Sequence, residues 1–519
     1  MADTPPEELD RATDGLSVNA NGRQLRRNVL SSYGAFLLQL LLGLVLAPAL
    51  LRGLGQGGFG TLTVVTALAS YVGIAELGLG TATVRAVAAA TAGNNDDELN
   101  VLASTSLLLY LAVAGTGSLV LVGMVVALPN LGVHEGLAAA RAALLLLGGA
   151  QALALMLNVF PALLYGTGRS SRLTNIGSVA AVLGGVLQIA ASLGTGSLIL
   201  VATAGASLTG VSALLIGVAA RRQLPGVRLS VAAARQEVAG QLLRSGWRNA
   251  VIGVSAALAF NTDALIVGGF LGAPAVAAYG VAARAASLVG GLSTRLSDVL
   301  VPTFAHFAVL NDRDRVYALY RDSVQAGLLL AIPGGILALT TGPALLHLWL
   351  GSVPTGSDKV LYLLVCSAVL AVPGAAAFRL LSGMSRLRFV TAAAAVAAAV
   401  NLLIGLVSTP LVGVVGPAVG TLVTAFGYDV LVMPTHACHE LGFPVSRLLR
   451  DIRFLAVPAV VGFGAGAVAQ TLGDTPFGVL ARCALVGVVY AAVVLATMGA
   501  HRRRRFSGAL LGRVQESTA

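Results

Sequence analysis

The chain alternates between long apolar runs and short polar connections from about Leu30 to Met498. About fourteen of these runs reach the length of roughly 20 residues that an α-helix needs to cross a bilayer. The runs are continuous and lack the alternation of a transmembrane strand, so they predict an all-α polytopic membrane protein. The predicted spans cover residues 33–54, 60–82, 103–127, 137–165, 173–194, 197–219, 249–271, 274–297, 323–348, 359–382, 388–410, 412–434, 453–473 and 476–498.

The basic residues are distributed with the same regularity. If the N-terminus is cytoplasmic, nearly all of them fall on cytoplasmic connections, as the positive-inside rule requires. Five basic residues depart from this arrangement, namely Arg52, Arg141, Arg284, Lys359 and Arg482. A missed span would invert the sides of every later connection. The regularity therefore supports the number of spans and a cytoplasmic location for both termini.

Composition narrows the class further. The chain has 519 residues, of which 56% are hydrophobic and 11% charged, whereas a soluble protein carries about 25% charged residues. The net charge of +11 is explained by the cytoplasmic arginines, and no basic stripe with interleaved aromatic residues predicts a nucleic-acid partner. The three cysteines, Cys366, Cys438 and Cys483, have no disulfide-like or metal-like spacing. No metal and no cofactor are expected.

Polar segments at the two ends predict cytoplasmic tails. Residues 1–27 lack the apolar core of a signal peptide and predict a disordered tail. Residues 499–519 predict a basic tail.

The longest internal connection, residues 221–248, divides the chain near its middle. It separates a predicted N-terminal lobe of six spans (28–220) from a C-terminal lobe of six spans (249–434), and a final helix pair occupies 435–498. Within the connection, residues 231–244 have one apolar face. This pattern predicts an amphipathic helix on the inner membrane surface, with a plain polar linker as the alternative.

The two lobes share a short sequence pattern. Leu54-Gly55 precedes Phe59-Gly60 and the second span, and Leu271-Gly272 precedes Tyr279-Gly280 and the eighth span. This repeat predicts two lobes of the same orientation, related by a pseudo-twofold axis along the membrane normal. Internal repeats of this kind are typical of secondary transporters, which place the substrate path between the repeats.

Several short motifs together resemble those of a known superfamily. The residues that carry the likeness are Asn28, Pro48 to Gly55, Phe59-Gly60, Glu76 to Gly80 with Arg85, Asn261 to Gly272, Ala278 to Arg284, and Pro302. With the number and order of the spans, they resemble the multidrug/oligosaccharidyl-lipid/polysaccharide exporter superfamily. Within it, the sequence is most similar to the polysaccharide-transporter branch of lipid-linked oligosaccharide flippases.

The resemblance implies a transporter and not an enzyme. Such a protein moves a polyprenyl-diphosphate-linked oligosaccharide from the inner to the outer leaflet of the cell membrane by alternating access, for cell-surface polysaccharide biosynthesis. Its partners would be the lipid-linked glycan and membrane lipids, and we expect a monomer. H⁺, Na⁺ and the membrane potential remain open as driving forces.

Three alternatives are weighed against this function. A lipid II flippase is a sibling that the sequence does not separate. A multidrug and toxin extrusion-type pump exports organic cations and needs acidic residues in its cavity, but the first span, from Tyr33 to Leu54, contains none. A membrane glycan polymerase or ligase needs a large outer loop, and the predicted outer connections are short.

Arg284 is the strongest candidate for binding the cargo diphosphate. It lies near the middle of the eighth span, and a guanidinium pairs with phosphate oxygens in a bidentate geometry. Asp263 lies at a similar depth in the preceding span and can pair with Arg284. Two interpretations follow: the cargo competes with Asp263 for Arg284, or the two residues form a structural pair. Asn261 and Tyr279, in the same motifs, are further cavity candidates.

Other ionisable residues have weaker claims. Arg52, at the outer end of the first span, either receives the diphosphate or extends to the membrane surface. Glu76 is a candidate coupling group, as is Asp263, or else a partner of Arg85. Arg482 is expected to extend from a span end to the surface, and Asp429 to lie near the inner end of its span.

The predicted topology can be tested by cysteine labelling. Single cysteines within residues 351–356 should react with a membrane-impermeant reagent in intact cells, because this connection is predicted to lie outside. Cysteines within residues 221–235 should react only after permeabilisation. The reverse pattern would refute the orientation.

Overall fold

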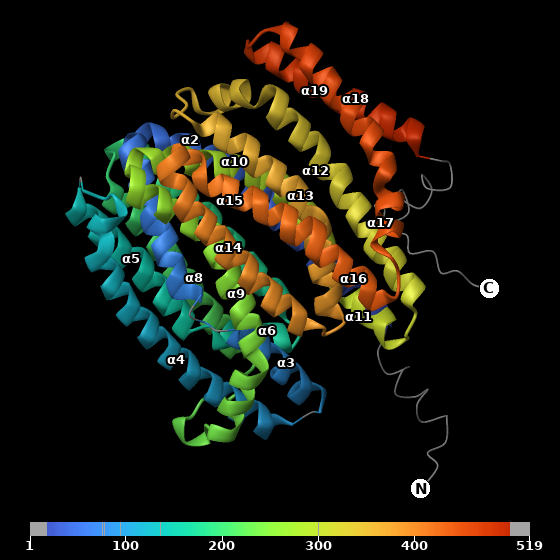
Figure 1. The fold of residues 1–519 in the computed structure, drawn as a ribbon. Coiled ribbons are helices and arrows are strands. Elements are labelled where there is room, and N and C mark those ends of the chain that lie inside the picture. The colour runs from blue at the N-terminus through green and yellow to red at the C-terminus, as the bar shows by residue number, and fades with distance from the viewer. Residues whose placement is uncertain are drawn as a thin grey trace. The chain divides into compact units, whose positions relative to one another are not determined.

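The computed structural model describes residues 18–498, apart from Ala75, Leu77, Asn94, Glu135 and Val299. The described part contains helices and no strand, as expected (Figure 1). The α-helices are α2 (Val18–Ile74), α3 (Leu79–Ala92), α4 (Asp96–Ala127), α5 (Leu137–Met156), α6 (Val159–Gly166), α7 (Ser170–Thr195), α8 (Leu198–Gln223), α9 (Gln236–Leu271), α10 (Ala273–Asp298), α11 (Val301–Val309), α12 (Arg313–Leu350), α13 (Ser357–Gly383), α14 (Leu387–Val412), α15 (Gly416–Thr424), α16 (Met433–Leu441), α17 (Val445–Ile452), α18 (Ala456–Ala469) and α19 (Pro476–Thr497).

Five short 3₁₀ helices and one π-helix complete the described elements. The 3₁₀ helices are η1 (Leu128–Leu131), η2 (Val231–Ala233), η3 (Gly413–Val415), η5 (Arg453–Leu455) and η6 (Gln470–Leu472), and η4 (Ala425–Val432) is the π-helix. α2 already begins at Val18, within the segment expected to be a disordered tail. The expected basic tail, 499–519, lies outside the described residues.

Twelve helical segments of the described chain are long and apolar enough to cross a membrane. Leu41–Ile74 covers most of two of the predicted spans, and Leu387–Leu441 contains two others. Gly55, with φ of 70°, interrupts the first, and Gly413, with φ of 72°, interrupts the second. The twelve segments are therefore compatible with fourteen crossings, and that number stays a prediction.

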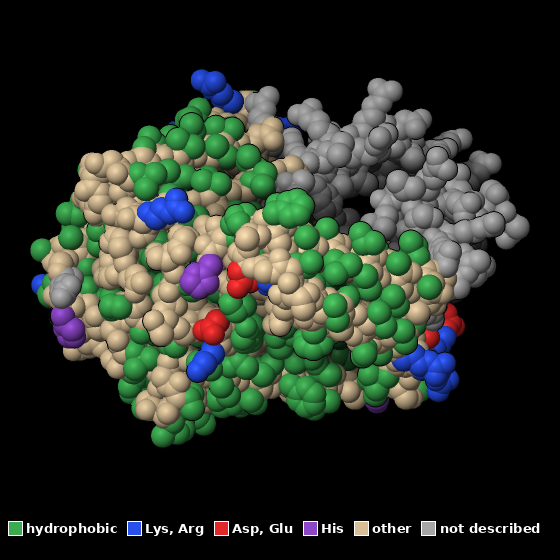
Figure 2. Space-filling view, turned by 90° about the horizontal axis from the view of Figure 1, so that it is seen from above, with side chains coloured by type: hydrophobic (Ala, Val, Ile, Leu, Met, Phe, Trp, Pro, Cys, Tyr) green, Lys and Arg blue, Asp and Glu red, His purple; other side chains and the backbone are tan. Residues whose placement is uncertain are grey.

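Many large apolar side chains are exposed on these helices. Leu119 is 75% exposed, Leu411 77% and Phe477 82%. In the space-filling view of Figure 2, hydrophobic side chains are spread over the visible face and charged ones are sparse. Such a surface is suited to lipid contact.

The helices cluster into two compact units. Among the described residues, the first consists of 18–53, Leu68–Val126 and Ala138–Ala250, and its core includes Tyr110, Leu163 and Leu164. The second consists of Leu54–Ala67, Ala127–Leu137 and 251–498, and its largest core cluster surrounds Tyr317 and Tyr320. The two six-span lobes and their symmetry stay predictions.

Two short segments of the N-terminal half, Leu54–Ala67 and Ala127–Leu137, belong to the second unit. Within that unit they pack on the turn between α9 and α10 through glycines. A Cβ atom at Gly60 would collide with the carbonyl oxygen of Ala273, and one at Gly132 with the carbonyl oxygen of Gly268. The segments therefore meet this turn backbone to backbone, at positions where only glycine fits.

Two of the predicted spans are broken where continuous helices were expected. The second span ends at Ile74 and resumes at Leu79, because Gly78 adopts a left-handed conformation with φ of 66°. Gly78 also lies so close to Gly246 and Ala250 that a Cβ there would collide with their backbones. The fourth span breaks between α5 and α6.

The inter-lobe connection differs from the amphipathic surface helix expected over residues 231–244. Only Val231–Ala233 forms a short 3₁₀ turn, and α9 starts at Gln236 and continues without interruption to Leu271. No proline separates the amphipathic segment from the seventh span, so one helix contains both.

The C-terminal helices α18 and α19 lie beside α12 (Figure 1). Gln470 donates to the carbonyl oxygen of Thr340 at 3.0 Å, and Tyr490 packs with Ile336. Arg482 does not extend to the surface as expected. It is 4% exposed and forms an ion pair with Asp474 at 2.8 Å.

Candidate functional site

A buried polar cluster in the second unit surrounds Asp263 of α9. Asp263 is 4% exposed, and its Oδ2 atom accepts hydrogen bonds from the Tyr279 hydroxyl of α10 and, at 3.3 Å, from the Thr421 hydroxyl of α15. Asn401 of α14 donates to the Thr421 hydroxyl oxygen at 3.2 Å. We call these four residues the Asp263 cluster.

The Asp263 cluster surrounds one carboxylate with hydroxyl and amide groups. Tyr279 and Thr421 stabilise the charged carboxylate, because hydrogen bonds donated to an ionised acid favour that form. The Asp263 Oδ1 atom is buried and has no hydrogen-bond partner in the described part of the chain. This oxygen is therefore available to a proton or to a small cation.

Arg284 lies apart from this cluster. Its guanidinium stacks over the Phe59 ring at 5.6 Å, on the α2 segment that belongs to the second unit. The contact is possible because Gly280, one turn earlier on α10, lets the helix approach Thr63; a Cβ there would lie 3.3 Å from the Thr63 methyl.

The expected ion pair between Arg284 and Asp263 is wrong. Tyr279 is the α10 residue that faces Asp263. Arg284 follows five residues later, about 140° further around the helix axis, and points elsewhere. Among the described side chains, none of the acidic groups comes within ion-pair distance of Arg284. Arg284 is thus a partly buried cation without an acidic partner in the described chain.

Glu76 belongs to a second cluster, in the first unit. It lies in the break between α2 and α3, where its carboxylate faces the backbone N–H of Gly80 and the side chain of Asn158. The neighbouring Tyr110 hydroxyl is fully buried and has no partner among the described residues. The break in the helix therefore places Glu76 beside polar groups of α3 and of the residue that precedes α6.

Glu76 does not pair with Arg85, in contrast to one of the two interpretations of the sequence. Arg85 donates to the carbonyl oxygens of Thr81, at 3.3 Å, and Ser245, at 3.4 Å. The Arg85 side chain reaches the backbone of α9 instead, because the break at Gly78 brings α3 close to that helix. Glu76 thus keeps the alternative role of a coupling candidate.

Two further candidates lie outside both clusters. Asn261 is partly buried on α9, and its position two residues before Asp263 directs it to a different face of the helix. Arg52 is exposed, three residues before the kink at Gly55. Conversely, sequence reasoning missed Asn401, Thr421 and Tyr110, which are ordinary residues in apolar spans and gave no motif.

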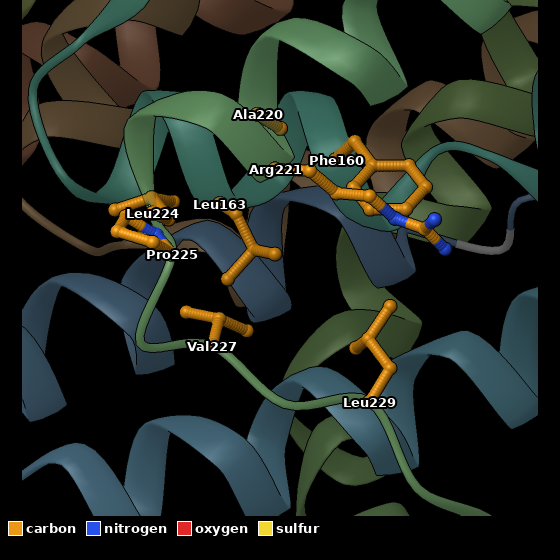
Figure 3. Close-up of a pocket in the computed structure, with 8 residues that line it drawn as sticks. All are labelled: Phe160, Leu163, Ala220, Arg221, Leu224, Pro225, Val227 and Leu229. Carbon is orange, nitrogen blue, oxygen red and sulfur yellow. The ribbon is translucent and has the colours of Figure 1, made fainter.

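A pocket of about 310 Å³ lies at the end of α8, in the first unit (Figure 3). It is lined by apolar residues of α6, α8 and the following connection, and by Arg221, whose guanidinium stacks over Phe160 at 5.7 Å. None of the predicted site residues lines it. No group of three potential metal-binding side chains occurs among the described residues.

The chain belongs to the polysaccharide biosynthesis protein family, whose sequence profile matches residues 25–308, more than half of its length. No curated protein matches the chain in sequence. The family and the fold together confirm the expected exporter superfamily.

Solved structures share the fold at low sequence identity. Lipid II flippase MurJ in an inward closed conformation superposes with a TM-score of 0.68 at 13% identity, covering 90% of this chain and 98% of that one. A multidrug resistance MATE family transporter of the MOP superfamily, inward-facing, gives a TM-score of 0.61 at 17% identity, covering 79% and 96%. An outward-facing structure of a multidrug resistance MATE family transporter of the MOP superfamily superposes with a TM-score of 0.56 at 17% identity. The match covers 82% of this chain and 96% of that one.

Replacing Tyr279 by Phe tests the Asp263 cluster. The substitution removes a donor from a buried carboxylate, and we expect it to lower the free energy of unfolding by about 1–3 kcal/mol. The measurement is denaturant or thermal unfolding of the purified protein in detergent. Tyr165→Phe is the matched control, because Tyr165 is 51% exposed. Equal stability of the two variants would contradict the assigned hydrogen bond.

Proposed function

We propose that the protein flips a polyprenyl-diphosphate-linked oligosaccharide from the inner to the outer leaflet of the cell membrane. The observation that carries the proposal is Arg284, a cation with no acidic partner among the described residues, on a membrane helix. Arg284 follows the start of α10 by eleven residues, or about 17 Å, which is near the middle of a hydrocarbon core about 30 Å thick.

An unpaired arginine at this depth is costly, by about 2.5–3.5 kcal/mol on insertion scales, and such residues usually serve a transport path. An anionic ligand would compensate this cost. The planar guanidinium pairs with two phosphate oxygens at once, and the Phe59 ring beneath it holds its orientation through a cation–π contact. A diphosphate attached to a lipid carrier therefore fits the position, and membership of the polysaccharide biosynthesis family supports a glycan as its cargo.

The alternative cargoes differ from the proposed one either in the sign of their charge or in the sugar that they carry. An organic cation would be repelled by Arg284, which disfavours a multidrug pump although the fold is shared. Lipid II is also a polyprenyl-diphosphate-linked sugar, so a lipid II flippase is the second candidate, supported by the fold similarity to MurJ.

The glycine contacts of the second unit support alternating access. With a cytoplasmic N-terminus, the segments 54–67 and 127–137 and the α9–α10 turn all lie on the outer side. Their backbone contacts at Gly60 and Gly132 would then close the outer end of the path while the cargo enters from within. We infer that these contacts separate when the transporter opens outward.

Coupling to a cation gradient is assigned to the Asp263 cluster. The free Oδ1 oxygen and the hydroxyl and amide groups around it offer oxygen ligands within one buried site. Glu76 is the second coupling candidate, in the first unit. The transporter is proposed to act as a monomer with both termini in the cytoplasm.

Replacing Arg284 tests cargo binding. Arg284→Ala should abolish flipping while the protein inserts at a normal level, because the diphosphate loses its counter-ion. Arg284→Lys should rescue transport only in part, since an ammonium keeps the charge but loses the bidentate geometry. The measurement is mass spectrometry of lipid-linked glycans that accumulate on the inner leaflet.

Arg315→Ala is the matched control for this experiment. Arg315 also stacks over a phenylalanine, at 5.8 Å from the Phe307 ring, but its side chain is 66% exposed. This variant should transport normally. Normal flipping by the Asp263→Leu/Arg284→Leu double variant would exclude Arg284 from cargo binding.

Replacing Gly60 tests the outer closure. Gly60→Val should keep the α2 segment away from Ala273 and so raise the labelling rate of a single cysteine at Thr63 by an impermeant reagent, by about tenfold or more, in a background without the native cysteines. Gly57→Val is the control, because a Cβ at Gly57 meets nothing within 4 Å. Equal labelling in the two variants would argue against a closure at Gly60.

A further inference from the structure

The π-helix η4 interrupts an otherwise α-helical span in the second unit. It covers Ala425–Val432, between α15 and α16, and no proline lies inside it. π-helices account for well under 1% of residues and usually form single turns, frequently at functional sites. A π-helix of eight residues therefore makes this part of the span a candidate functional site.

Asp429 lies in the middle of this π-helix and of the helical segment 416–441. It follows Gly416 by thirteen residues and precedes Leu441 by twelve. The helix continues to Leu441, beyond the predicted end of the span at residue 434, and the expected position of Asp429 near the inner end of the span stays a prediction.

The Asp429 carboxyl is pressed against the backbone of α13. A Cβ atom at Gly374 would collide with the Oδ1 atom, the Cβ atom and the Cα atom of Asp429. Gly374 follows Pro373, whose carbonyl oxygen already accepts a hydrogen bond from the Tyr320 hydroxyl at 3.4 Å. The close approach excludes other groups from this side of the carboxyl.

No charged group of the packed helices compensates Asp429 within the described part of the chain. On α13, the Arg379 guanidinium stacks over Phe378 at 5.2 Å and donates to the Ala375 carbonyl oxygen. Ionisable groups of the other packed segments are Arg388 at the start of α14, Tyr428 beside Asp429, and His436, Cys438, His439 and Glu440 at the end of α16. His436 stacks on Phe389 and faces Glu440. None of them forms an ion pair or hydrogen bond with Asp429.

The contrast with Asp263 is informative. The Asp263 carboxylate receives hydrogen bonds from Tyr279 and Thr421, which stabilise its charge. Asp429 is partly buried and lacks such donors in the described structure, and an acid that is partly removed from water without donors or a cation favours its neutral form. The two acids of the second unit are therefore suited to different ligands.

We propose that Asp429 is a proton-binding site, and that its carboxyl group is protonated when η4 packs on Gly374. The neutral group tolerates contact with the α13 backbone. A carboxylate needs water or a donor, and movement of η4 away from α13 would open the side of the carboxyl that Gly374 covers. Proton binding at Asp429 is thereby linked to the packing of the π-helix, and this inference does not depend on the identity of the cargo.

Infrared spectroscopy of the purified protein in lipid nanodiscs at neutral pH tests the proposal without a transport assay. A protonated carboxyl gives a C=O stretching band that is absent from carboxylates and shifts in D₂O. Asp429→Asn should lose one such band, whereas Asp263→Asn should keep it. Asp429→Glu should shift the band and not remove it, which covers the case in which the Asn variant fails to fold. A spectrum in which the protonated-carboxyl band is unchanged in both Asp429 variants would overturn the proposal.

Discussion

A charge inside a membrane must be neutralised, hydrogen-bonded or matched by a ligand, and this constraint sorts the ionisable groups of the described helices. Asp474 neutralises Arg482, and donated hydrogen bonds stabilise Asp263. Arg284 and Asp429 have neither in the described chain. The anion proposed for the first and the proton proposed for the second would satisfy the constraint.

The fold alone does not decide the cargo. A MATE family transporter and lipid II flippase MurJ both superpose on most of this chain, at 17% and 13% identity. What distinguishes this chain is the sign and surroundings of its buried charges. Arg284 beside Phe59 suits a diphosphate, and the close packing of Gly60 on Ala273, which only glycine permits, is the proposed outer closure of the path.

The sequence predicted the helices well, because contact with lipid requires an apolar residue at nearly every position of a span. It also placed Asp263 and Arg284 at similar depths. It did not predict their rotation about the helix axes, so the expected ion pair was wrong and Tyr279 faces Asp263 instead. Thr421, 158 residues further along the chain, joins the cluster through packing alone. The breaks at Gly78 and in η4 arise from backbone packing for which an apolar run gives no signal.

The central claim is that Arg284 binds an anionic group of the cargo. It is tested most directly by measuring the affinity of the purified protein for a polyprenyl diphosphate without sugars, and for the corresponding polyprenol. The account predicts that Arg284→Gln raises the Kd for the diphosphate by about tenfold or more, because the variant loses a charge-assisted bidentate contact. Polyprenol should bind the two proteins equally. Unchanged affinity of the variant for the diphosphate would contradict the account.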